Sequence, residues 1–177
     1  MFGSILRTIF SGVIRMAEAD RCVWKERTWQ DNWNNVVRNV LFPDDKLKEL
    51  MLVPQGTDIM KFCDKYFIRD GSTDELLTNE KVRVVHHDAE GFDTFNPHVK
   101  GKYHEFDIFV SEDVEHTATK DRLQSRQVLV AERIKYLLLR KKVVEQISFK
   151  YQDEYDQWTK TVGYKLYKLT LWYKTTV

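Results

Sequence analysis

Residues 163–175, GYKLYKLTLWYKT, alternate in the manner of a long β-strand that is apolar on both faces. One predicted face carries Tyr167, Leu169, Leu171 and Tyr173. The other face carries Tyr164, Leu166 and Trp172. An antiparallel strand commonly leaves one face to water, so this pattern predicts that both faces of its sheet are covered. The helices expected near the N-terminus, or a neighbouring subunit, would cover the second face.

The rest of the C-terminal half predicts three more strands and one long helix. Alternation predicts strands at 82–88 and 103–112, and again at 145–155. Between them, residues 116–142 carry apolar side chains at helical spacing. The predicted stripe consists of Leu123, Gln127, Val130, Ile134, Leu137 and Leu138. The order predicts an α+β fold, with a mostly antiparallel four-stranded sheet (β-β-α-β-β) and one helix packed on it.

Residues 1–80 are predicted to form a separate N-terminal extension, partly helical and partly irregular. Apolar residues recur at helical spacing in 1–21 and again in 28–42, and Pro43 ends the second helix. Residues 44–80 show weaker patterns and several turn signals. We therefore expect a boundary near residue 80.

The charge of the chain argues against bulk attraction to nucleic acid or membranes, and its cysteines argue against a cysteine metal site. The chain has 177 residues and a net charge of +1, so no overall field favours nucleic acid or an anionic membrane. Any contact with DNA would have to be local. Cys22 and Cys63 have no metal-ligand spacing. No segment approaches the ~20 apolar residues of a membrane-spanning helix. We expect no membrane partner, and a peripheral membrane protein that inserts Phe2–Ile14 remains a third hypothesis.

A cluster of histidines and carboxylates in residues 86–107 raises the question of a metal site. His86 and His87 are adjacent in a predicted strand, so only one of them can share a face with His104. Glu105 and Asp107 do share a face, as a two-metal nuclease requires, but a solvated strand has the same pattern. A small metal-dependent nuclease remains the alternative hypothesis.

Other catalytic signatures are lacking. The sequence contains no GxSxG motif, and no glycine-rich loop introduces a helix. We therefore expect a protein that is not an enzyme, with no catalytic residues, no bound metal and no cofactor.

The order of elements in residues 81–177 resembles that of the tail-terminator, or tail-completion, proteins of long-tailed bacteriophages. The segments that carry the resemblance are VRVVHHD, YHEFDIFVSED, RLQSRQVLVAERIKYLLL, EQISFKYQDEY and GYKLYKLTLWYK. The resemblance is one of pattern and order, and it covers a little over half of the chain. The first 80 residues depart from it in length. Another neck component, such as a head-completion or stopper protein, therefore remains open.

The resemblance implies a structural virion protein that acts at the neck of the phage. Residues 81–177 would form a homo-oligomeric ring, expected to be a hexamer, at the head-proximal end of the tail. The ring would end the tail tube, join it to the head-completion or connector protein, and leave a channel for DNA without sequence-specific contact. The protein would reach the virion from the host cytoplasm, where assembly takes place.

The resemblance also suggests which residues contact partners. Residues 88–102 are rich in Gly, Asp and Asn, and predict a long loop that is mobile until assembly. The partner-contact candidates are Phe92, Phe95 and His98 on this loop, and Tyr164, Leu166 and Trp172 on the last strand.

Overall fold

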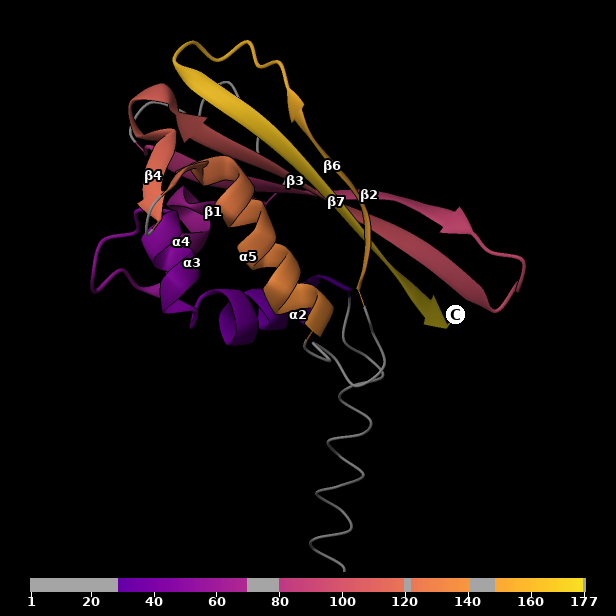
Figure 1. The fold of residues 1–177 in the computed structure, drawn as a ribbon. Coiled ribbons are helices and arrows are strands. Elements are labelled where there is room, and N and C mark those ends of the chain that lie inside the picture. The colour runs from indigo at the N-terminus through magenta and orange to yellow at the C-terminus, as the bar shows by residue number, and fades with distance from the viewer. Residues whose placement is uncertain (1–28, 70–79, 120–121, 141–148, 177) are drawn as a thin grey trace, which may run out of the picture. The chain divides into compact units, whose positions relative to one another are not determined.

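The computed structural model describes residues 29–69, 80–119, 122–140 and 149–176 (Figure 1). The chain divides into two compact units, Met1–Asn35 and Val36–Val177. The second unit contains a five-stranded sheet and a two-stranded ribbon.

The sheet has the strand order β1-β2-β3-β7-β6. Its strands are β1 (Phe67–Arg69), β2 (Val82–Asp93), β3 (Val99–Ser111), β6 (Lys150–Gln157) and β7 (Tyr164–Thr176). Strand β1 is parallel to β2, and all the other pairs are antiparallel. The ribbon consists of β4 (His116–Thr119) and β5 (Arg122–Ser125).

The helices are short apart from α5. They are α2 (Trp29–Val36), the π-helical segment η1 (Val37–Leu41), α3 (Asp45–Leu50), α4 (Ile59–Lys65), the 3-10 turn η2 (Glu112–Val114) and α5 (Arg126–Arg140). Helix α5 lies beside β3 and β7 in Figure 1 and contacts β3, β6 and β7.

One face of the sheet, here called the inner face, forms the core with α5 and α4. Cross-strand register places Ile108 and Phe106 on this face, opposite Tyr167 and Leu169 of β7. The side of α5 that packs here is fully buried at Val130, Ala131, Ile134 and Leu138. Phe62 of α4 stacks on Phe67 with ring centroids 6.0 Å apart, and Phe67 lies 6.2 Å from Phe106.

Polar contacts fix α5 at both of its sides. Asp44 caps α3 by accepting a hydrogen bond from the Leu47 backbone N–H at 2.7 Å. The same carboxylate receives two hydrogen bonds from Arg133 of α5, Nε to Oδ1 at 2.9 Å and Nη2 to Oδ2 at 2.6 Å. On the other side, Lys135 Nζ donates to Glu154 Oε1 of β6 at 2.8 Å. Side-chain pairs therefore hold α5 to α3 and to the edge of the sheet.

The α+β class predicted from the sequence is confirmed, but the long helix begins later than predicted. Residues 116–119 and 122–125 pair as the β4–β5 ribbon, which the Arg126 N–H closes by donating to the Glu115 carbonyl at 2.7 Å. Leu123, predicted to join the apolar stripe, belongs to β5 and is 75% exposed. Backbone pairing in the ribbon overrides the helical spacing of the preceding residues.

The prediction of a long loop at residues 88–102 is also wrong. Strand β2 continues to Asp93 and β3 begins at Val99, so only residues 94–98 connect them. The register shifts between Asp88 and Gly91, and pairing then resumes with Phe92 opposite Gly101. A β-bulge therefore interrupts the strand where the sequence suggested that it ended.

A domain boundary at residue 80 does not match the compact units. Strand β1, which precedes residue 80, pairs with β2, and Leu47 and Phe62 are fully buried within the same unit as the sheet. The predicted helix at 1–21 lies outside the described residues.

Candidate functional site

The second face of the sheet, which we call the open face, carries apolar, charged and aromatic side chains. Alternation along the strands and cross-strand register place on it Val85, His87, Phe92, Tyr103, Glu105, Asp107, Phe109, Lys150, Tyr164, Leu166, Lys168, Thr170, Trp172 and Lys174. These side chains form three successive zones along the long strands: an apolar end, a charged band and an aromatic end.

The apolar end lies near the start of β7. Val85, Phe109 and Leu166 pack together and are 1%, 1% and 7% exposed, and half-buried Tyr164 packs against them. The Tyr164 hydroxyl donates a hydrogen bond to the backbone carbonyl of Glu80 at 3.0 Å. Of the two partner-contact candidates in this zone, Tyr164 and Leu166, only Tyr164 therefore retains appreciable exposed surface.

The charged band crosses the middle of the face. Lys168 Nζ lies 3.3 Å from Asp107 Oδ1 and 3.5 Å from Glu105 Oε2, and His87 Nε2 lies 3.4 Å from Asp107 Oδ2. Burial acts to lower the pKa of Lys168, but the Asp107 and Glu105 carboxylates raise it, so that the net pKa lies above its ordinary value. Lys168 therefore stays cationic and neutralises part of the charge of the two carboxylates.

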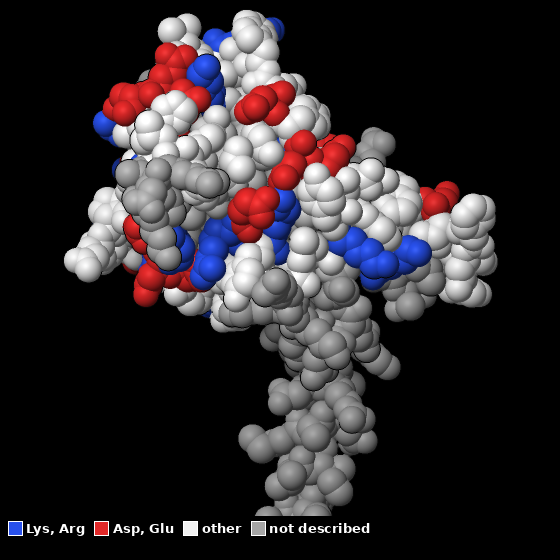
Figure 2. All heavy atoms as spheres, in the orientation of Figure 1, with Lys and Arg blue, Asp and Glu red and all other residues white. Residues whose placement is uncertain are grey.

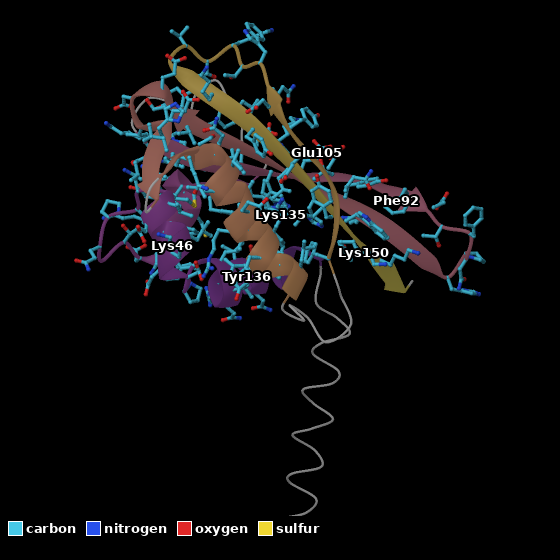
Figure 3. The ribbon with its side chains drawn as sticks, viewed as in Figure 1. Lys46, Phe92, Glu105, Lys135, Tyr136 and Lys150 are labelled. Carbon is cyan, nitrogen blue, oxygen red and sulfur yellow. The ribbon has the colours of Figure 1, made fainter. Side chains whose placement is uncertain are left out.

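The aromatic end lies beyond the bulge in β2. The ring of Phe92 is centred 4.7 Å from Tyr103 and 5.9 Å from Trp172. The ammonium groups of Lys150 and Lys174 lie 5.1 and 5.6 Å from the centre of the Trp172 ring. Figure 3 labels Phe92 and Lys150 at this end of the sheet, and basic side chains gather there in Figure 2. We call these five residues the aromatic patch.

Gly101 makes this arrangement possible. A Cβ atom at position 101 would lie only 2.0 Å from Cζ of Phe92, because the Phe92 ring lies directly over the Gly101 backbone. Gly101 is paired with Phe92 on β2 and with Lys174 on β7. The lack of a side chain at Gly101 therefore leaves the space that the Phe92 ring occupies.

Exposed apolar side chains also mark the two ends of the sheet. Phe95 lies in the β2–β3 connection and has its whole side chain in solvent. Trp158 and Val162 lie in the β6–β7 connection and are 78% and 94% exposed. The two connections stand at opposite ends of the long strands in Figure 1.

The histidines and carboxylates considered as metal ligands are divided between the two faces. His86 Nε2 and His104 Nδ1 lie 2.7 Å apart on the inner face, and both rings are fully buried. His87, Glu105 and Asp107 lie on the open face. Among the residues that the structure describes, no group of three or more His, Cys, Asp or Glu side chains is placed to hold a metal ion.

The six partner-contact candidates are thus not brought together at one place. Phe92 and Trp172 meet in the aromatic patch, and Tyr164 and Leu166 meet at the apolar end. Phe95 and His98 are exposed in the hairpin connection, where the His98 N–H donates to Asn96 Oδ1 at 3.0 Å.

Sequence reasoning missed Tyr103, Lys150 and Lys174 as members of a surface site. Each of them alternates with apolar residues. This alternation predicts a strand, but it does not predict which strand pairs with it or in which register. Their proximity depends on the register of β3, β6 and β7.

No described helix has the length and hydropathy needed to cross a membrane. Comparisons of the sequence with protein-family models and with curated proteins found no match.

Proposed function

We propose that this chain is a structural virion protein, a ring-forming subunit at the head-proximal end of the tail of a long-tailed bacteriophage. The ring ends the tail tube, joins it to the head connector and leaves a channel for DNA. The resemblance of residues 81–177 to tail-terminator proteins suggests the location. The observation that carries the proposal is the presence of large exposed apolar side chains at both ends of the β3–β7 ladder.

The two ends are far enough apart to serve different partners. The ladder joins 13 residue pairs, from Val99 with Thr176 to Ser111 with Tyr164. At ~3.3 Å per residue, it spans about 40 Å. Phe95 stands beyond one end, and Trp158 stands beyond the other. A subunit that joins a tail tube to a head connector needs such a pair of opposed contact surfaces.

Aromatic side chains suit this role because they bury a large area at little cost in side-chain entropy. Phe95 and Trp158 are already exposed, so no packing within the subunit is lost when they enter a partner's pocket. Tyr164, Trp172 and Phe92 are half-buried and offer further contact area on the open face. Leu166, at 7% exposed, supports Tyr164 in this arrangement instead of reaching a partner.

The nuclease alternative gains no specific support from the geometry. Its candidate ligands are divided: His86 and His104 are buried on the inner face, whereas His87, Glu105 and Asp107 lie on the other side of the sheet, where Lys168 contacts both carboxylates. A single centre that used both sets of ligands would have to cross the backbone of β3.

Gene replacement tests the proposal in the phage whose genome encodes the chain. Deleting the coding sequence should leave filled heads without tails and tail tubes of irregular length, and the wild-type gene supplied in trans should restore joined particles. Complementation with Phe95→Ser or with Trp158→Ser should each restore fewer joined particles, because each variant loses the contact at one end. Met60→Ser is a matched control, since Met60 is 66% exposed and belongs to α4 and to neither hairpin connection. Normal joined particles in the deletion strain would overturn the proposal.

A further inference from the structure

We propose that the aromatic patch, formed by Phe92, Tyr103, Lys150, Trp172 and Lys174, binds single-stranded nucleic acid. This proposal stands apart from the role in the neck, because it rests only on the chemistry of the open face.

The first support is the arrangement of the rings. Phe92, Tyr103 and Trp172 come from three adjacent strands, and each is half-buried, so each is held in place and still reaches solvent. Tyr103 and Trp172 are direct cross-strand partners, and Phe92 packs against both. Rigid aromatic side chains on a sheet are the surfaces on which unpaired bases stack, since every base has a planar face.

The second support is the charge around Trp172. Lys150 is its cross-strand partner on β6, and Lys174 follows it by two residues on the same face of β7. Both lysines are exposed, and both ammonium groups lie within 6 Å of the ring centre, at 5.1 and 5.6 Å. A base that stacks on Trp172 displaces these ammonium groups from the ring, and the two cations are then close enough to pair with the phosphates of the same strand. The chain as a whole is nearly neutral, so this attraction is confined to the patch.

Neighbouring carboxylates set one limit of the site. The next row of the ladder pairs Thr170 with Glu105 on one side and with Asp153 on the other. Glu105 is engaged by Lys168 at 3.5 Å, whereas Asp153 is exposed. Phosphates are repelled from this row, so the bound strand crosses the sheet on the side nearer the β2–β3 connection.

The chemistry favours a single-stranded nucleic acid over an acidic protein segment or a duplex. An acidic peptide would use the two lysines but has no planar group for each of the three rings. A duplex keeps its bases stacked inside, where Phe92, Tyr103 and Trp172 cannot reach them. Only an unpaired strand offers phosphates and free base faces together.

Binding of a fluorescein-labelled oligo-dT of about 20 nucleotides to the full chain, followed by fluorescence anisotropy in about 50 mM salt, tests this inference. We expect binding that Trp172→Leu weakens by roughly 5- to 150-fold, the range typical of losing one stacked base. The double variant Lys150→Ala/Lys174→Ala should reduce the slope of log K against log salt by about 1.4, because two phosphate contacts are lost at about 0.7 each. The matched control Lys46→Ala/Lys61→Ala removes two exposed lysines from α3 and α4 and should leave both quantities unchanged.

Three results would overturn the inference. The first is that the wild-type protein does not bind oligo-dT up to about 100 μM protein, where even weak non-specific binding is detectable. The second is that the control variant loses as much affinity as the double lysine variant. The third is that duplex DNA or poly-glutamate competes for the protein as well as unlabelled oligo-dT does. The double lysine variant changes only exposed side chains, so a folded protein is expected, and its circular dichroism spectrum verifies this. Phage assembly is measured separately, so failure of oligonucleotide binding leaves the proposed neck function intact.

Discussion

The side chain of Phe92 occupies the space directly above Gly101, with its Cζ atom 2.0 Å from the point where a Cβ of residue 101 would stand. The two residues are paired across β2 and β3, after the bulge between Asp88 and Gly91. The contact therefore links the backbone of the hairpin to the aromatic patch. A glycine that resembles a loop signal in the sequence is instead a packing requirement.

Gly101→Ala should displace the Phe92 ring and weaken oligo-dT binding. The methyl group cannot fit unless the ring rotates away from Tyr103 and Trp172, so the patch loses one of its stacking surfaces. The anisotropy assay measures the effect. In a Phe92→Leu background, the same substitution should add little further loss, and a full additional loss there would contradict the role assigned to this contact.

Ile134→Ala should lower the free energy of unfolding by about 2–5 kcal/mol. Ile134 is fully buried on the side of α5 that packs against the inner face of the sheet, so truncation leaves a cavity. Urea denaturation followed by circular dichroism measures the change. Glu132→Ala, an exposed position on the same helix, should change stability by less than ~0.5 kcal/mol. A loss below ~1 kcal/mol for Ile134→Ala would mean that α5 does not pack as described.

Asp44→Ala should destabilise the protein more than Asp44→Asn does. Asp44 accepts from the Leu47 N–H as the cap of α3 and also pairs with Arg133. Asparagine keeps the capping oxygen and removes the charge, whereas alanine removes both, so the two variants should differ by about 1 kcal/mol. Thermal or urea unfolding measures the difference. Equal stabilities would show that the cap contributes nothing.

Alkaline pH should destabilise the protein through Tyr66. Burial, and then the hydrogen bond with Glu80, raise the pKa of Tyr66 from its ordinary value of 10.0 to about 12. A group whose pKa is raised by folding favours the folded state in its protonated form. Its contribution is therefore complete below pH 10 and disappears as the pH rises through about 12.

Urea unfolding of wild type and Tyr66→Phe from pH 8 to 12 isolates this contribution. The fall in stability above pH 10 should be smaller in the variant, because phenylalanine cannot ionise. Parallel curves for the two proteins across this range would exclude Tyr66 as a source of the alkaline loss.

The long strands and the position of the core were predictable because alternation persists over many residues. Leu169 and Leu171 were correctly assigned to one face of β7, and both are fully buried, as are Phe106 and Ile108 of the neighbouring predicted strand. Such long periodic segments leave little choice of which side chains enter the core.

Short and irregular elements were not predictable in the same way. The three residues of β1 are too few for a period, and the ribbon that contains Leu123 continues by chance the helical spacing of α5. Gly91 and Gly101 suggested a loop because glycine weakens any strand prediction, although Gly101 is needed under Phe92.

The aromatic patch depends on information that one sequence does not contain. Lys150 and Trp172 are 22 positions apart in the sequence and become neighbours only through the β6–β7 register, which shifts between Tyr151 and Asp153. The residue types were visible in the sequence, but their convergence was set by strand pairing.

The proposed location of the chain at the neck of a virion is the part of the account that one measurement tests most directly. Electron microscopy of long-tailed phage particles produced from a genome that carries this coding sequence, the source we propose, labelled with gold-conjugated antibody to the protein, provides the measurement. The account predicts gold at the junction of head and tail, and a ring of subunits there in averaged images. Label distributed elsewhere on the particle, or particles that lack the protein altogether, would contradict it.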